Sequence, residues 1–259
     1  MSVPPLELPE PTQSMLRSAR SLLRRKERRA SGRFLVEGRQ AVREALGVPG
    51  VVEAVFFHWA SAHDNIDLID LAAAAGVPQY GVSEQNLATM IDTVTPQGVV
   101  AVARDIDVPL AEVLSDGLEL VLICAQVRDP GNAGTVIRCA DAAGADAVIL
   151  SSDSVEVYNP PVVVGVDLAD AIAACRDAGL QIFATDGAAG TDLTDLSGEL
   201  ARPTAWVMGN ESWGLPVEHL ELADRTVAVP IYGKAESLNL ATAAAVCLYA
   251  SATAQRATS

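Results

Sequence analysis

The chain has 259 residues and a formal net charge of −15 at pH 7, and 50% of its residues are hydrophobic. This composition excludes intrinsic disorder as the dominant state, and it excludes collagen-like and low-complexity classes. Apolar runs such as Leu118 to Val127 are interrupted by charge before the roughly 20 residues of a membrane-spanning helix, so we expect no membrane span.

The first 105 residues predict a small α/β domain. Apolar residues alternate with arginines from Thr12 to Arg29, which indicates a helix, and Gly76 stands where glycine commonly ends one. Residues 106–117 are expected to be a linker. We expect helices over residues 12–29, 40–46 and 65–75 and after an N-cap at Ser83, and strands over residues 33–38, 51–58, 77–80 and 98–104.

A second alternating series fills residues 118–259. Its first strand, residues 118–127, is almost entirely apolar, as expected for a strand buried on both faces. Alternation of strands and helices predicts a mostly parallel sheet with helices on both faces. We expect strands over residues 118–127, 147–150, 180–184, 204–208 and 226–229, and helices over residues 134–143, 168–178 and 238–254.

The charge of the chain is divided unevenly. Residues 1–43 carry ten basic and four acidic side chains, a net +6, whereas residues 44–259 carry eight basic and 29 acidic ones, a net −21. A local basic patch can bind phosphates even in an acidic protein, although a solvated basic helix without a partner is the alternative. The candidates for RNA contact are Arg17, Arg20, Arg24, Arg25, Lys26, Arg28, Arg29 and Arg33.

Several other residues carry weaker signals. The four cysteines are widely and irregularly spaced, so we expect buried free thiols, no metal site and a reducing cytoplasmic environment. The Pro-rich N-terminus does not resemble a secretory signal. We expect Trp59, Trp206 and Trp213 to be mainly packing residues, although Trp213 lies within one of the motifs below.

Three segments of the second half combine a strand end, a glycine-containing loop and a helix start. They are Val127 to Arg138, Val207 to Pro216 and Val229 to Ala241. Loops of this kind at the carboxyl ends of parallel strands are where open α/β sheets bind ligands. Each one taken singly is also consistent with an ordinary strand–helix turn, and Ser237 is then a helix N-cap.

Together the three segments resemble the SpoU/TrmH branch of the SPOUT RNA methyltransferases. The shared patterns are N-x-G-x-x-x-R from Asn132, G-N-E-x-x-G from Gly209 and P-I-x-G-x-x-E-S-L-N from Pro230. Residues 34–38 and 95–99 are similar to segments of the ribosomal-protein-like RNA-binding domain that many members carry. The resemblance implies an N-terminal RNA-binding domain (residues 1–105), the linker, and a knotted SPOUT methyltransferase domain (residues 118–259).

The resemblance also implies a trefoil knot, a homodimer with its active site across the interface, and S-adenosylmethionine as cofactor. The second and third motifs would hold that cofactor, with backbone groups at Gly209 and Ile231 and apolar walls around them. The implied cofactor residues are Thr185, Asp186, Met208, Gly209, Asn210, Ile231, Ser237, Leu238 and Leu240.

The implied reaction is methylation of a ribose 2′-hydroxyl of RNA. The sulfonium of the donor is already activated, so the reaction requires no metal. Arg138 cannot readily act as a base, because its pKa exceeds about 12, and we expect it to hold an RNA phosphate and to stabilise the developing alkoxide. Asn132 would orient the ribose, Glu211 would hold Arg138 or its loop, and Ser237 and Asn239 would complete the site.

The two-domain arrangement favours 23S rRNA as the substrate, with an antibiotic-resistance role left open. A tRNA 2′-O-methyltransferase is the alternative within the same class. A non-catalytic RNA-binding protein that keeps the fold is a second alternative, against which the intact motif residues argue. A general nucleotide-binding α/β enzyme is a third, and it is disfavoured because no G-x-x-x-x-G-K phosphate loop is present.

The chain departs from the family pattern after Asn159-Pro160. Members of the family have about a dozen further residues there, including an arginine, before the strand that here follows directly at Pro161. Either this protein has lost the segment or the printed sequence lacks it, and we favour the second. An intact mass of 27.0 kDa would indicate a true deletion, and a larger mass would indicate a missing segment.

Overall fold

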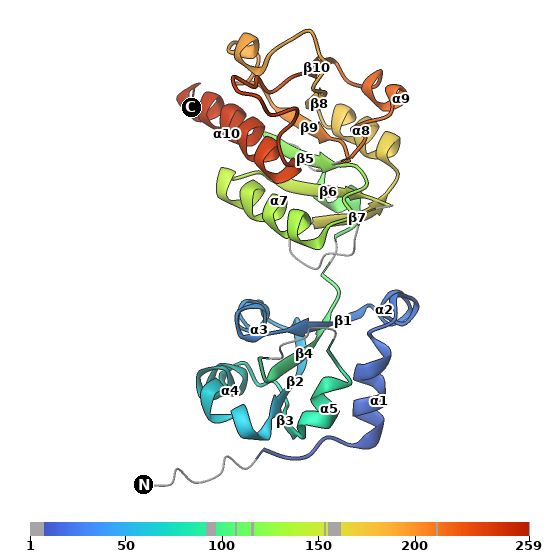
Figure 1. Ribbon diagram of the computed structural model, residues 1–259, viewed down its shortest axis with the longest axis vertical. Coiled ribbons are helices and arrows are strands. Elements are labelled where there is room, and N and C mark those ends of the chain that lie inside the picture. Colours follow the sequence, from blue (N-terminus) through green and yellow to red (C-terminus); the bar gives the residue numbers. More distant parts are fainter. Residues whose placement is uncertain are drawn as a thin grey trace. The chain divides into compact units, whose positions relative to one another are not determined.

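The computed structural model describes residues 8–91, 97–106, 108–114, 117–152, 154, 162–210 and 212–258. The chain divides into two compact units, residues 1–105 and 106–259, which are considered separately here (Figure 1). Within the described ranges, no helix combines the length and the apolar character needed to cross a membrane. The altered stretch around Asn159-Pro160 lies outside the described residues.

The first unit contains a four-stranded sheet and five α-helices within its described part. The strand order is β1-β4-β2-β3. Only β2 and β3 pair in parallel, and β4 is antiparallel to both of its neighbours, so this sheet is mixed. The elements are α1 (Gln13–Ser21), α2 (Arg25–Ser31), β1 (Arg33–Glu37), α3 (Arg39–Leu46), β2 (Val52–His58), α4 (Ile66–Ala74), β3 (Gln79–Val82), α5 (Glu84–Ala88) and β4 (Val99–Arg104).

The expected single helix over residues 12–29 is two helices, α1 and α2. Helix α1 starts at the Thr12 N-cap and ends at Ser21, and the carbonyl groups of the two residues after it accept hydrogen bonds from a side chain. The Arg28 guanidinium donates to the carbonyls of Leu22 (3.0 Å) and Leu23 (2.9 Å). This contact satisfies carbonyl groups that a helix end leaves without partners, and it fixes the turn between α1 and α2.

The second unit is built on a six-stranded sheet of order β10-β8-β9-β5-β6-β7, and every pair in it is parallel. This confirms the α/β class with a mostly parallel sheet. The knot implied by the resemblance stays a prediction. The elements are α6 (Leu110–Val113), β5 (Leu120–Cys124), α7 (Pro130–Ala143), β6 (Ala147–Ser151), β7 (Val162–Val166), α8 (Leu168–Asp177), β8 (Gln181–Thr185), β9 (Thr204–Met208), α9 (Val217–Leu220), β10 (Arg225–Val227) and α10 (Leu240–Thr258).

Helices cover both faces of this sheet. On one face α7 and α10 lie side by side over β5 and β9, and α8 packs on the other face (Figure 1). The central strands β5 and β9 are fully buried, as the apolar run at residues 118–127 predicts. Trp206 on β9 is fully buried and donates from its indole N–H to the Ser251 hydroxyl (3.0 Å) on α10, which ties that helix to the sheet.

Residues 106–117 contain the short helix α6. Its apolar side chains Leu110 and Val113 are partly buried against the core on the α8 side of the large sheet. In addition, the backbone N–H of Val108 donates to the carbonyl of Val162 at the start of β7 (3.4 Å). This part of the expected linker therefore packs on the second unit.

Two helices that carry motif residues begin at other positions than expected. Helix α7 begins at Pro130, four residues before the predicted start, because Asp129 caps it by accepting from the backbone N–H of Asn132 (2.7 Å). Helix α10 begins at Leu240, and Asn239 in place of Ser237 accepts from the N–H of Ala241 (2.9 Å). Proline in a first turn and an Asp or Asn cap are common at helix starts.

The four cysteines are free, and three of them are buried, as the sequence predicts. Burial raises the pKa of the Cys175 and Cys247 thiols to about 12 and so disfavours the reactive thiolate. We expect Ellman's reagent to modify one thiol rapidly in the native protein, the half-buried Cys139, and all four after denaturation. Rapid reaction of two or more native thiols, or retention of this reactivity in Cys139→Ser, would contradict the packing described here.

Candidate active site

The three motif segments follow strands of the second unit and meet at one edge of its sheet. Strands β5 and β9 are adjacent and parallel, so the loops after Cys124 and Met208 leave the sheet beside each other. Such a loop cluster at the carboxyl ends of parallel strands is the usual ligand position in an open α/β sheet.

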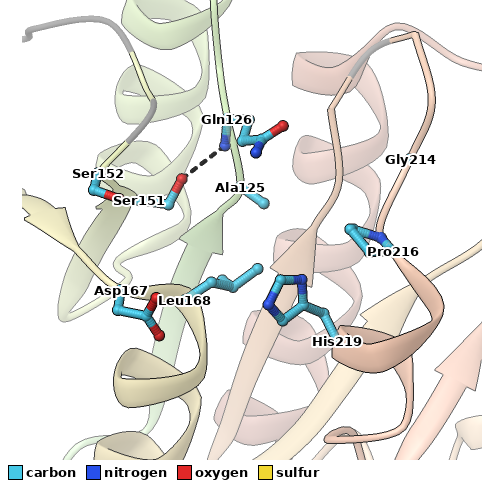
Figure 2. Close-up of a pocket in the computed structure, with 9 residues that line it drawn as sticks. All are labelled: Ala125, Gln126, Ser151, Ser152, Asp167, Leu168, Gly214, Pro216 and His219. Atoms are coloured by element: carbon cyan, nitrogen blue, oxygen red, sulfur yellow. Dashed lines mark hydrogen bonds between the residues drawn. The ribbon is translucent and has the colours of Figure 1, made fainter.

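A hydrogen-bond network joins the first two loops. The buried side chain of Asn210 donates from its amide to the carbonyl of Gln126 (2.7 Å). Gln126 has φ = 52°, a left-handed conformation that few non-glycine residues adopt, and its N–H donates to the Ser151 hydroxyl at the end of β6 (2.8 Å; Figure 2). Three strand ends are thereby linked, and Asn210, predicted as a cofactor residue, is a structural residue of this edge.

A small cavity of about 80 Å³, open to solvent, lies next to this network. Figure 2 shows the apolar side chains of Ala125, Leu168 and Pro216 and the polar side chains of Asp167 and His219 around it. None of its lining residues was predicted from the sequence as a site residue. They come from four separate strand ends and helix starts, which no local pattern in the sequence connects.

The first and third motifs are joined directly. The side-chain amide of Asn239 donates to the side-chain oxygen of Asn132 over 2.9 Å, although the two residues are 107 positions apart. Asn239 is exposed and Asn132 half-buried, so solvent reaches the pair, and each residue stands at the start of its helix, α10 and α7. The structure therefore brings these two predicted catalytic residues together.

The predicted cofactor residues at the ends of β8 and β9 also lie together. The Thr185 hydroxyl donates to the carbonyl of Val207 (3.3 Å) and lies 3.2 Å from the sulfur of Met208, which is buried. Asp186 follows directly and turns the chain, because its carboxylate accepts from the N–H of Ala188 (3.0 Å). These contacts place residues from both strands at the same edge as the motif loops.

Glycine is required at position 209. A Cβ atom built there would lie 2.3 Å from the carbonyl carbon of Gly214 and 2.5 Å from the nitrogen of Leu215. These are backbone atoms, and Asn210 and Gly214 exchange two backbone hydrogen bonds (3.0 and 2.9 Å) that hold them in place. The second motif is thus a closed turn in which the backbone at Gly214 and Leu215 lies directly against Gly209.

The third motif loop is exposed along its whole length from Ile231 to Asn239. Ile231 and Leu238 are apolar and more than a third exposed, and Ser237 is exposed beside Leu238, whereas Leu240 is buried in the first turn of α10. Exposed apolar side chains on a loop suit a ligand with an apolar body and polar edges. The residues present therefore fit S-adenosylmethionine.

The two remaining predicted catalytic residues are placed differently. Arg138 lies on α7, more than two turns from Pro130, and its side chain is exposed. In the described part of the chain it forms no contact with the other site residues. Arg138 is therefore not in contact with the Asn132–Asn239 pair, and its place in one catalytic site with them stays a prediction. Glu211 lies outside the described residues, as do residues 95 and 96 of the N-terminal similarity.

The predicted RNA-contact residues lie on α1, on α2, in the turn between them, and at the start of β1. Some of them make contacts within the unit: Arg17 donates to the carbonyl of Gln13 (3.3 Å), Arg28 donates to carbonyls in the turn after α1, and Arg33 pairs with Glu53 (2.8 Å). Exposed basic side chains make up most of the set, namely Arg17, Arg20, Arg24, Arg25, Lys26 and Arg29. The basic side chains therefore gather on the surface of α1 and α2, and several of them also contribute to the local structure.

Comparison with known families identifies the chain. Residues 119–249 match the family model described as the SpoU rRNA methylase family. This chain belongs to the SpoU rRNA methylase family. Residues 14–101 match a second model, the MRM3-like substrate binding domain. The assignment covers the three motif loops, β5 to β9 and most of α10.

Named relatives span nearly the whole chain. The 23S rRNA (guanosine(2553)-2′-O)-methyltransferase RlmP of Bacillus subtilis is 32% identical over 237 residues, which are 87% of this chain and 90% of RlmP. The 23S rRNA (guanosine-2′-O-)-methyltransferase RlmB of Bordetella pertussis is 34% identical over 200 residues, which are 71% of this chain and 81% of RlmB.

Solved structures agree with this assignment. An AdoMet-bound rRNA methyltransferase from Sinorhizobium meliloti superimposes with a TM-score of 0.76 at 29% identity and covers 95% of this chain and 97% of its own. The SpoU methyltransferase AviRb from Streptomyces viridochromogenes, in complex with AdoMet, gives a TM-score of 0.76 at 27% identity and covers 95% and 100%. The family, the α/β fold and the order of its two parts are thus shown for this chain.

Proposed function

We propose that this protein transfers the methyl group of S-adenosylmethionine to a ribose 2′-hydroxyl of 23S rRNA. The observation that carries the proposal is the hydrogen bond between Asn132 and Asn239, which joins the first and third SpoU motifs at the sheet edge. Relatives that match most of the chain are named as 23S rRNA 2′-O-methyltransferases. We infer residues 1–105 as the RNA-binding domain, 106–117 as the linker and 118–259 as the methyltransferase domain.

The second and third motif loops hold the cofactor in this proposal. Backbone groups at Gly209 and Ile231 bind its polar edges, Met208, Leu238 and Leu240 supply apolar contact, and the cofactor provides an activated methyl group when it is bound. Support comes from the exposure of the third loop and from the closed turn at Gly209. The other residues assigned to this site are Thr185, Asp186, Asn210 and Ser237.

The catalytic side chains act on the ribose. A ribose hydroxyl is a weak nucleophile near neutral pH and gains reactivity when it is oriented and its developing negative charge is stabilised. Asn132 and Asn239 orient the sugar through their amide groups. Arg138 holds the adjacent phosphate and stabilises the alkoxide, Ser237 borders the site, and Glu211 positions the arginine or its loop.

The decisive test is transfer of labelled methyl groups from S-adenosylmethionine to unmethylated 23S rRNA and to unmethylated tRNA, assayed separately. Label at ribose positions of 23S rRNA alone would support the proposal. Label in tRNA alone would favour the alternative substrate. Absence of label together with absence of cofactor binding would overturn the enzymatic function and leave a non-catalytic RNA-binding protein.

The exposed basic side chains of α1 and α2 bind RNA phosphates in this proposal. We expect the triple variant Arg20→Ala, Arg24→Ala, Lys26→Ala to weaken binding to 23S rRNA, and to lower the slope of log affinity against log salt by up to about two to three. Filter binding between 50 and 200 mM salt measures both quantities. The matched control is Arg202→Ala, an exposed arginine of the second unit away from the motif loops. An unchanged slope in the triple variant would place the RNA surface elsewhere.

We also infer that the protein acts in the cytoplasm, where its rRNA substrate and a reducing environment for its four free thiols are found.

We further infer that the protein works as a homodimer, as the family resemblance implies. Sedimentation of the purified protein at micromolar concentration tests the dimer, and a monomer that is active at the same concentration would contradict it.

A further inference from the structure

Trp213 is the exposed aromatic residue of the second motif loop. Its side chain is 52% exposed, whereas Trp206, seven residues earlier in the chain, is fully buried. The expectation that Trp213 is mainly a packing residue therefore differs from the structure. A large apolar ring held in solvent beside a candidate active site is a feature that often marks a binding surface.

The loop presents this ring in a fixed position. Asn210 and Gly214 exchange backbone hydrogen bonds on either side of Trp213, and the Asn210 side chain accepts from the N–H of Ser212 (2.8 Å). The same side chain donates to the carbonyl of Gln126, which anchors the turn to the loop after β5. An aromatic ring fixed in this way loses little conformational freedom when a ligand binds to it.

Arg128 lies against the ring. The central carbon of its guanidinium is 4.9 Å from the centre of the Trp213 ring, within the range of a cation–π contact. Arg128 comes from the loop after β5, four residues before Asn132, so the pair bridges the first and second motifs. Its stacking position leaves the N–H groups of the guanidinium edge available to an acceptor such as a phosphate oxygen.

Arg128 lies in a unit with an excess of acidic side chains. Residues 106–259 carry seven basic and 21 acidic side chains, a net −14. On its surface Arg176 pairs with Asp224 (2.9 Å) and Arg225 with Glu199 (3.0 Å). Arg128, in contrast, pairs with no carboxylate in the part of the chain that the structure describes. An unneutralised cation and an open aromatic face thus stand together at the edge where the motifs meet.

We propose that Trp213 and Arg128 form a nucleobase-stacking site for the substrate RNA. This inference rests on the proposed function and adds a contact made by residues of the motif segments that the motif patterns do not specify. An unpaired base of the RNA stacks on the open face of Trp213, and the Arg128 guanidinium donates to the phosphate of the same strand. Stacking of unpaired bases on aromatic side chains and on Arg planes is a main way in which proteins bind RNA loops.

The first test measures RNA and cofactor separately in two substitutions of Trp213. With 23S rRNA transcribed in vitro as the probe, we expect Trp213→Leu to raise the KM for RNA by about tenfold or more, because leucine keeps an apolar side chain but offers no ring face. Trp213→Phe keeps an aromatic ring, so its KM for RNA should rise much less. The Kd for S-adenosylmethionine should be unchanged in both variants, which separates stacking from damage to the cofactor loop.

A matched control comes from the same segment. Val217 is 70% exposed at the start of α9, and Val217→Ala removes apolar surface without touching the aromatic pair. Its KM for RNA should equal that of the parent protein. An equal KM in Trp213→Leu and the parent protein would overturn the stacking site while leaving the methyltransferase function intact. A change in sedimentation of Trp213→Leu from dimer to monomer would also overturn it, because the ring would then belong to a contact between copies.

A second readout does not depend on catalysis. In a Trp59→Phe background, Trp213 is the exposed tryptophan, since Trp206 is buried. Stacking predicts that a short oligoadenylate RNA quenches its fluorescence, and that the quenching disappears when Trp213→Phe is added. Replacing Arg128 by Lys retains the charge but not the planar stacking partner, and should weaken the quenching. Absence of quenching at RNA concentrations that saturate binding would overturn the proposal even if the protein methylates RNA.

Discussion

Replacing Arg138 by alanine is expected to lower methyl transfer to 23S rRNA by about a hundred- to thousandfold, the usual effect of removing one preorganised donor from a developing oxyanion. Arg138 is exposed on α7, the helix whose first turn carries Asn132. Side chains on a helix lean toward its N-terminus, so the guanidinium can extend back toward the motif edge. Arg138 is also one of only seven basic residues in the acidic second unit.

The measurement must separate chemistry from binding. Single-turnover transfer of labelled methyl groups gives the rate, and calorimetry gives the Kd for S-adenosylmethionine, which should be nearly unchanged because no cofactor residue is altered. Arg202→Ala serves as the matched control. Arg138→Lys keeps the charge without the two-pronged guanidinium and should recover a small part of the rate. Normal turnover in Arg138→Ala would remove this residue from the catalytic site.

The secondary structure of the second unit was largely predictable from the sequence. The strand at residues 204–208 is β9 with the expected bounds, and the apolar run at 118–127 contains the buried β5. Errors arose where a side chain ends or begins an element. The Arg28 guanidinium binds carbonyls five and six residues before it, in the turn after α1, and this contact is not visible in the apolar periodicity of the sequence. The start of α7, in contrast, could have been predicted, because an Asp followed by a Pro is a common sequence pattern at the beginning of a helix.

The candidate site shows the same division. The three glycine-containing loops are visible as local patterns, and their resemblance to one family predicted that Asn132 and Asn239 share a site. The contacts that assemble the edge run between loops: Asn210 with Gln126, and Arg128 with Trp213. Such pairs depend on which strands are neighbours, and the order β9-β5-β6 cannot be deduced from the order of the strands in the chain. The exposure of Trp213 is likewise a property of the fold.

Replacing Gly209 by alanine is expected to abolish specific binding of S-adenosylmethionine and to destabilise the protein by about 1–3 kcal/mol, the usual cost of overpacking. The added methyl group would lie 2.3 Å from the carbonyl carbon and 2.7 Å from the carbonyl oxygen of Gly214. Position 209 cannot retreat, because β9 is held on both sides by β5 and β8. The turn must therefore open, which separates Asn210 from Gly214 and moves the backbone groups assigned to the cofactor.

Calorimetric titration with S-adenosylmethionine and a thermal unfolding curve measure the two effects of Gly209→Ala. The matched control is Gly198→Ala in the same unit, where an added Cβ meets no atom within 4 Å and no strained φ is required. That variant should bind the cofactor as the parent protein does. If Gly209→Ala bound S-adenosylmethionine with the parent Kd, the closed turn would not be part of the cofactor site. If it lost binding with an unchanged Tm, the methyl group would be blocking the ligand directly, and the backbone of Gly209 itself would line the site.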